Sequence, residues 1–158
     1  MKKLLLSMVV VVLLLAPAFA QDKVVNATSV TFSVLSWEDI QKGLKDNPAD
    51  HSLDFHLKFA NAMSEMHGGG SEGAQHVMVL LTDATFGYQI SGVEVQVTAI
   101  SKTGTEKVTH QLKSMSVDGL PGYGEYFNLT SRGPYVFKVK ISQGKSRTHE
   151  TEFEKTIL

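Results

Sequence analysis

The chain has 158 residues, no cysteine and a formal net charge of −1. A charge this close to zero argues against nucleic acid as a partner, because binding to nucleic acid draws on a strongly basic surface. Disulfides are excluded, so a domain of this length must be held together by an ordinary hydrophobic core.

The first 20 residues have the pattern of a secretory signal peptide. Two lysines precede an apolar run, Leu4–Leu15, and small residues stand before a cleavage site that we expect after Ala20. The run is too short for a comfortable membrane span, which needs about 20 apolar residues. We therefore expect residues 21–158 to be soluble and exported to a bacterial periplasm, without membrane insertion after signal cleavage.

Residues 21–50 are predicted to form an N-terminal arm that contains a short helix. The β-branched run at 30–35 is compatible with a strand or with an ordered arm. Ser36 is a typical helix N-cap, and Trp37–Lys45 follows it with acidic residues early and basic residues late. An Asp-Asn-Pro sequence at 46–48 ends this helix.

Residues 51–158 are predicted to form about seven strands. Apolar and polar residues alternate at 51–59, which favours a strand, although Leu53, Leu57, Ala60 and Met63 also fit a helical period. Six further segments with turn sequences between them lie at 75–82, 93–99, 108–112, 125–129, 135–141 and 148–156. Short alternating strands at regular spacing are typical of an all-β sandwich of two antiparallel sheets.

Five segments resemble the strands of small exported immunoglobulin-like proteins of bacteria, related to YtkA-like and CopC-like periplasmic proteins. They are QHVMVLLTD at 75–83, ISGVEV at 90–95, LKSM at 112–115, GYGEYF at 122–127 and GPYVFKV at 133–139. The resemblance implies an immunoglobulin-like sandwich and a role in handling copper or accompanying a metal transporter. Gln75 and Glu125 depart from the pattern, in which a histidine and an asparagine stand at these positions.

Candidate metal ligands begin with His76 and Met78. They are two residues apart on a predicted strand, so both point to the same face. An imidazole and a thioether together suit Cu(I). The alternative is that Met78 fills the core and His76 is a strand-end residue bonded to backbone. Met115 falls on the polar phase of its strand, which indicates a bulge, a strand end or a site.

A second group of possible ligands precedes that strand. Met63, Met66 and His67 stand just before the glycines of residues 68–70, which allow the chain to turn back beside His76. The stretch SEMHGGGSEGAQHVM at 64–78 therefore predicts a metal-facing rim, with a copper ion as the candidate ligand. The alternative is an ordinary flexible loop.

The remaining histidines are expected to be structural. His56 lies on the polar phase of its predicted strand and should be solvated, whereas His110 and His149 fall on apolar phases and should be inward or edge residues.

No catalytic motif is present in the sequence. A nucleophile elbow, an H-E-x-x-H motif and a P-loop are all missing, so we expect a binding protein and not an enzyme. Two functions remain open. The first is copper delivery, buffering or resistance, with a membrane transporter or another exported protein as partner. The second is a metal-free exported domain that binds a protein.

Overall fold

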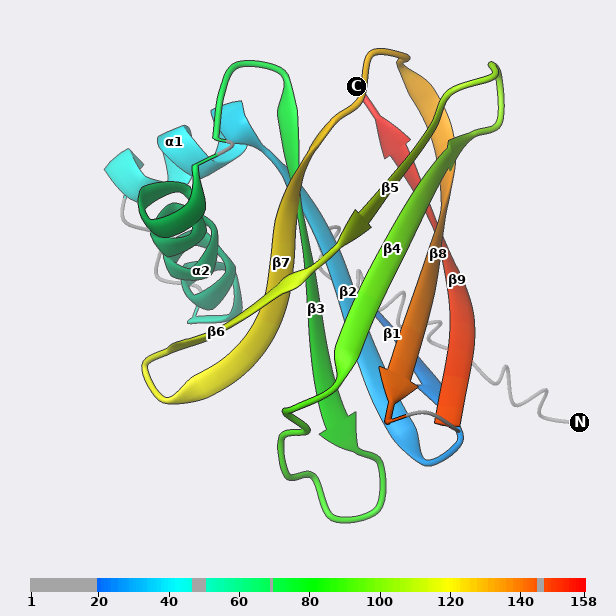
Figure 1. The fold of residues 1–158 in the computed structure, drawn as a ribbon. Helices are drawn as coiled ribbons and strands as arrows, with labels where there is room; N and C mark the ends of the chain where they lie inside the picture. Colours follow the sequence, from blue (N-terminus) through cyan, green and yellow to red (C-terminus); the bar gives the residue numbers. More distant parts are fainter. Residues whose placement is uncertain (1–19, 47–50, 69, 145–146) are drawn as a thin grey trace, which may run out of the picture.

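Two antiparallel β-sheets pack face to face and form the body of the protein (Figure 1). The structure is a computed structural model that describes residues 20–46, 51–68, 70–144 and 147–158. In these residues sheet A has the strand order β1-β2-β3-β7-β6, and sheet B has the order β5-β4-β8-β9. The bounds are β1 Ala20–Val25, β2 Thr28–Ser36, α1 Trp37–Asp46, α2 His51–His67, β3 Ala74–Asp83, β4 Glu94–Ser101, β5 Lys107–Gln111, β6 Lys113–Val117, β7 Leu120–Asn128, β8 Gly133–Gln143 and β9 Arg147–Ile157.

One apolar core fills the space between the two sheets. Alternate residues of both sheets point into it, as the sequence pattern predicts. Phe32 of β2 stacks on Phe153 of β9 with 4.7 Å between ring centroids, and it lies 5.2 Å from Phe137 of β8. The antiparallel sandwich is therefore confirmed, but the described residues form nine strands and not about seven.

The strand predicted at 108–112 corresponds to β5, and a further strand, β6, follows it directly in the other sheet. β5 pairs with β4 in sheet B, and β6 pairs with β7 in sheet A. Leu112 stands between them, is buried in the core, and donates its backbone N–H to the carbonyl of Val95 at 2.7 Å. The chain therefore crosses from one sheet to the other at a single anchored residue.

Residues 51–67 form the helix α2, so the preferred prediction of a strand at 51–59 is wrong. Figure 1 shows α1 and α2 gathered on one side of sheet A, away from β8 and β9. His56, Phe59, Ala60 and Met63 follow a helical period and are buried there. The hydroxyl of Tyr126 on β7 donates to the carbonyl of Ala60 at 2.7 Å, which fastens the helix to the sheet. The sequence at 51–59 fits the period of a strand and that of a helix, and contact with sheet A selects the helix.

The N-terminal segment contributes two strands and the predicted helix. β2 pairs with β3 along its whole length, so the alternative of a strand at 30–35 is confirmed. Ser36 Oγ accepts a hydrogen bond from the backbone N–H of Asp39 at 3.0 Å, as expected for the N-cap of α1. The predicted signal peptide comprises residues 1–20, of which residues 1–19 lie outside the described residues. The residues just before the boundary predicted between residues 50 and 51, residues 47–50, also lie outside them. None of the helices in the described part of the chain is long and apolar enough to cross a membrane.

Glu106 ties the turn before β5 to the connection between β7 and β8. Its carboxylate accepts hydrogen bonds from the backbone N–H groups of Thr130 and Ser131, each at 2.8 Å, and lies against the hydroxyl of Tyr135. Burial alone raises the pKa of Glu106, but these hydrogen bonds outweigh it and lower the pKa to about 2. The carboxylate is therefore ionised at neutral pH and holds three segments together.

Replacing Glu106 with glutamine should lower the free energy of unfolding by about 1–3 kcal/mol at pH 7. The neutral amide weakens the charge-assisted hydrogen bonds, and its NH2 group faces backbone donors. Urea denaturation measures the loss. Glu94→Gln is the matched control, because Glu94 is exposed on β4 and should change stability by less than about 0.5 kcal/mol. Equal losses in the two variants would contradict the assigned role of Glu106.

Candidate metal centre

Two histidines and a serine form a buried chain of polar side chains between α2 and sheet A. His56 of α2 is 3% exposed and His76 of β3 is 0% exposed. Ser33 Oγ on β2 lies 2.9 Å from Nδ1 of His56, and Nε2 of His56 lies 3.0 Å from Nδ1 of His76. Three elements therefore bring together side chains that are 20 or more residues apart in the sequence.

The direction of the protons in this chain decides what His76 presents. In one arrangement Nδ1–H of His76 donates to His56, Nδ1–H of His56 donates to Ser33 Oγ, and Nε2 of His76 keeps its lone pair. In the reverse arrangement the Ser33 hydroxyl donates to His56, and Nε2 of His76 carries a hydrogen. Among the described residues, Nε2 of His76 has no hydrogen-bond partner in either case. Metal-binding histidines use the first arrangement, in which one ring nitrogen donates a hydrogen bond and the other keeps its lone pair for the metal.

Burial keeps both imidazoles neutral. Loss of solvation lowers the pKa of His56 to about 3. The same loss, with a smaller contribution from the nearby charge of His56 when it is protonated, lowers the pKa of His76 well below its usual range. At neutral pH, a proton therefore does not compete for the lone pair of either ring.

Gly122 and Gly124 of β7 form a groove on the face of sheet A that α2 covers, and Phe59 occupies this glycine groove. A Cβ atom on Gly124 would lie 2.7 Å from Cε1 of Phe59 and 2.9 Å from Nε2 of His76. A Cβ atom on Gly122 would lie 2.7 Å from Cε2 of Phe59. Met78 stands directly opposite Gly124 in the strand pairing. His76, Met78 and Phe59 therefore all border the backbone of Gly124.

Two further methionines belong to the same apolar cluster. Met63 of α2 is 0% exposed, and Met115 of β6 is partly buried and stands opposite Gly122. The position of Met115 on the polar phase of its strand is explained by α2, which covers this face of sheet A. His76, Met78 and Met115 thus share the face of sheet A that α2 covers, and the ring of Phe59 lies in the glycine groove on the same face. Metal binding by these residues stays a prediction.

Met66 and His67 lie apart from this cluster. Met66 is 66% exposed, and His67 is exposed at the end of α2. His67 follows His56 by 11 residues, which separates them by about 16 Å along the helix axis. The predicted rim that joins His67 to His76 across the glycine loop is therefore not formed, and His76 is buried where the rim required an accessible edge.

The prediction that His56 is solvated is wrong. His56 is buried and hydrogen-bonded to both Ser33 and His76. The signal was present in the helical alternative, because His56 stands three residues after Leu53 and four before Ala60. A helical period at 51–67 places His56 on the apolar face of the helix, where burial is expected.

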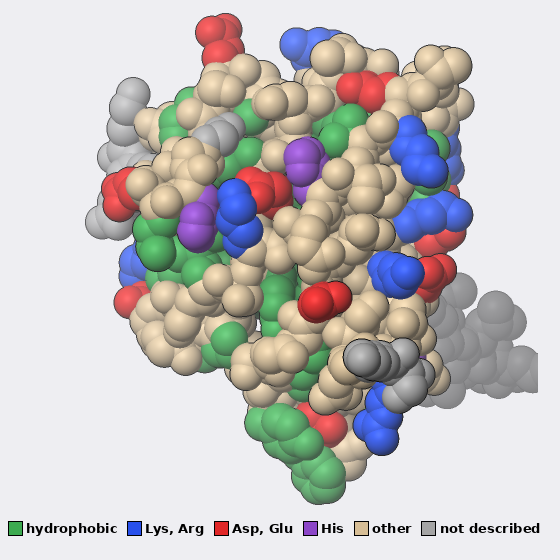
Figure 2. Space-filling model, in the orientation of Figure 1, with side chains coloured by type: hydrophobic (Ala, Val, Ile, Leu, Met, Phe, Trp, Pro, Cys, Tyr) green, Lys and Arg blue, Asp and Glu red, His purple; other side chains and the backbone are tan. Residues whose placement is uncertain are grey.

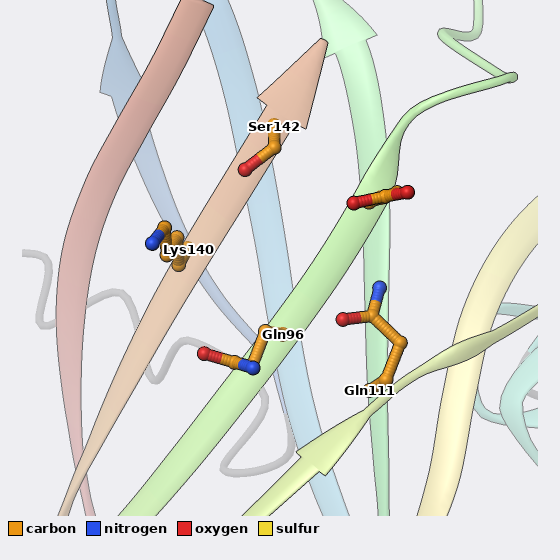
Figure 3. A pocket seen from close by; sticks show the side chains of 5 residues that line it. Gln96, Gln111, Lys140 and Ser142 are labelled. Atoms are coloured by element: carbon orange, nitrogen blue, oxygen red, sulfur yellow. The ribbon is translucent and has the colours of Figure 1, made fainter. Parts of the chain in front are cut away.

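The other polar groups of the described residues were also compared with the requirements of a metal ion. Among the described residues, no three His, Asp or Glu side chains lie close enough together to hold an ion. The rings of His110 and Phe127 form a T-shaped contact with 4.7 Å between centroids, and Nδ1 of His149 lies 2.7 Å from Nδ2 of Asn26. A shallow polar depression of about 110 Å³ lies on the outer face of sheet B. Figure 3 shows the side chains that line it, among them Gln96 of β4, Gln111 of β5, and Lys140 and Ser142 of β8.

The two packed sheets and their strand order define an immunoglobulin-like β-sandwich protein with a helical layer on sheet A. Neither a protein-family model nor a curated protein matches the sequence. Similar folds are present in solved structures, and the resemblance to small exported immunoglobulin-like proteins is confirmed at the level of the fold.

Three solved structures illustrate the similarity. A DUF4426 family protein from Pseudomonas aeruginosa has a TM-score of 0.62 at 14% identity, covering 88% of this chain and 94% of that chain. FetP from uropathogenic Escherichia coli has a TM-score of 0.61 at 13% identity, with 89% and 94% covered. Copper-reconstituted P19 from Campylobacter jejuni has a TM-score of 0.59 at 11% identity, with 88% and 94% covered.

Proposed function

We propose that the protein is an exported copper-binding protein of the periplasm that holds Cu(I) at Nε2 of His76, with Met78 as the neighbouring sulfur donor. The observation that carries the proposal is the fully buried Nε2 atom beside Gly124, for which no hydrogen-bond partner is present among the described residues. Imidazole nitrogen and thioether sulfur are donors that suit Cu(I). Met115 and Met63 are the candidates for a further sulfur ligand. The role is binding for delivery, buffering or resistance, without catalysis.

The surroundings of His76 favour a monovalent ion over a divalent one. The part of the chain that the structure describes has no cluster of carboxylates to neutralise a divalent charge. A single positive charge among neutral donors is less costly to bury than two. The copper-reconstituted P19 and a copper-bound FetP variant, which share the fold, support copper as the metal. The signal-peptide pattern supports export.

Entry of the ion requires a movement of α2. Phe59 fills the glycine groove and is 0% exposed, so its ring closes the path to Nε2 of His76. A shift of α2 away from sheet A would take the ring out of the groove. Binding should therefore be slower than diffusion, because it waits for this opening.

Anaerobic titration with Cu(I) against a competing chromogenic chelator tests the proposal. The mature protein should bind one equivalent, and His76→Ala should abolish stoichiometric binding. His56→Gln should weaken binding about 10–100-fold, because His56 orients the ring of His76 without touching the ion. Circular dichroism of each variant checks that it remains folded.

The exposed His67 provides the matched control. His67→Ala removes an imidazole outside the buried cluster and should leave the affinity unchanged. Loss of binding in His67→Ala with full binding in His76→Ala would transfer the site to the end of α2. Absence of stoichiometric binding by the wild-type protein would reject the copper function.

A second function, binding to an exported protein or a membrane transporter, is favoured by the tip of the loop between β3 and β4. Phe86 is 76% exposed and Tyr88 is 59% exposed, and their rings are nearly parallel with 6.1 Å between centroids. The carboxylate of Asp83 accepts hydrogen bonds from the N–H groups of Thr85 and Phe86, which fixes the loop. Figure 2 shows apolar side chains projecting at this tip. This surface is compatible with copper binding and would serve as the contact with a transporter.

A further inference from the structure

A cleft of about 840 Å³ opens at the end of the sandwich where α1 begins. It lies on the core side of sheet A, whereas the metal centre lies on the side that α2 covers. Four segments line it: the junction of β2 and α1, the loop before β3, the connection between β7 and β8, and the end of β9. Its volume falls within the range of about 300–1,000 Å³ that small-molecule sites occupy.

The floor of the cleft is apolar with one buried amide. Val34 and Ile157 contribute the apolar part, and Gln75 lies beside them on the core-facing side of β3. Gln75 is 9% exposed and lines the cleft. A buried amide offers one acceptor and two donors. These groups match the C=O and N–H of a peptide bond in a ligand.

The walls of the cleft carry opposite charges. Glu38, Asp39 and Glu72 stand on the side of α1 and the loop before β3, and Arg132 stands on the β7–β8 connection. Glu38 Oε1 accepts a hydrogen bond from the N–H of Gly73 at 2.8 Å. This hydrogen bond lowers the pKa of Glu38, and the charge of Arg132 adds to the effect. The carboxylate of Glu38 is therefore ionised at neutral pH and feels the charge of the Arg132 guanidinium.

We propose that this cleft binds a short peptide of two or three residues with free termini. The ammonium group lies toward Glu38 and Glu72, the carboxylate pairs with Arg132, and the peptide bond meets the amide of Gln75. One apolar side chain rests on the floor beside Val34. A single amino acid has both charges but no peptide bond for Gln75, so a peptide uses more of the cleft. The proposal is independent of copper.

Titration of the metal-free, ¹⁵N-labelled mature protein with the tripeptide Ala-Leu-Ala, followed by NMR, tests this binding site. Saturable shifts should appear at the backbone amides of Gln75, Ser131 and Arg132. N-acetylation or C-amidation of the peptide should each weaken binding about tenfold, because each removes one charge that the cleft pairs. Gln75→Leu keeps the side-chain volume and should weaken all three forms of the peptide.

Arg132→Gln and Lys140→Gln form the matched pair of variants. Each removes one positive charge from an exposed position, but Arg132 lines the cleft and Lys140 lies on the outer face of sheet B. Only Arg132→Gln should weaken binding, and it should do so for the free peptide but not for the C-amidated one. Absence of saturable shifts up to about 10 mM peptide, or equal binding of the doubly blocked peptide, would overturn the proposal.

Discussion

Acidification from pH 7 to pH 5 should lower the free energy of unfolding by about 2 kcal/mol for each of the two buried imidazoles, His56 and His76. Burial lowers the pKa of His56 to about 3 and that of His76 well below its usual range. An unfolded chain has histidines with a pKa near 6.5. Below that pH the unfolded state binds protons that the folded state excludes.

The sign of the effect follows from this difference. Stability is complete above the pKa of the unfolded histidines and falls as the pH drops through it. The loss continues to about pH 3, where His56 also accepts a proton in the folded state. Urea denaturation at a series of pH values measures the slope. Because carboxylates also titrate at the acidic end, the contribution of the histidines is read from variants.

His76→Gln removes one buried imidazole and should reduce the loss between pH 7 and pH 5 by about 2 kcal/mol. His67→Gln removes an exposed imidazole at the end of α2 and serves as the control for the loss of a histidine. It should keep the slope of the wild-type protein. The same slope in His76→Gln as in the wild-type protein would show that His76 is protonated in the folded state, in conflict with its burial.

The sequence pattern was sufficient for the sandwich because its strands have one face in the core and one face outward. Val95, Val97 and Ala99 alternate with polar residues, and these three are buried in the structure. The pattern failed at 51–59, where every second residue is apolar and a helical period is also satisfied. That choice depends on contact with sheet A, which no local pattern contains.

The candidate site was predicted only in part, because some of its contacts also depend on the packing of α2 against sheet A. The shared face of His76 and Met78 follows from their spacing on a strand, and the structure confirms it. The burial of His76 and its bond to His56 could not be predicted, because both depend on α2 packing over the glycine groove. Met66 and His67 are close to His76 in the sequence, but they are exposed at the end of α2 and lie apart from the buried His76.

Replacing Phe59 with alanine should lower the free energy of unfolding by about 3–5 kcal/mol. The ring is 0% exposed and lies against the backbone of both Gly122 and Gly124, beside the side chains of Leu80 and His76. The variant leaves a cavity in the glycine groove next to Nε2 of His76. Urea denaturation at pH 7 measures the loss, and Phe59→Leu should show a smaller one because leucine fills part of the groove.

The same substitution should accelerate the uptake of Cu(I), because it removes the ring that closes the path to His76. Stopped-flow mixing with a Cu(I) complex measures the rate. Phe127→Ala is the matched control: Phe127 is also 0% exposed and lies on β7, but it packs into the core between the sheets. It should lower stability to a similar extent and leave the uptake rate unchanged. Equal acceleration in both variants would indicate that general loosening admits the ion, and an unchanged rate in Phe59→Ala would place the entry path elsewhere.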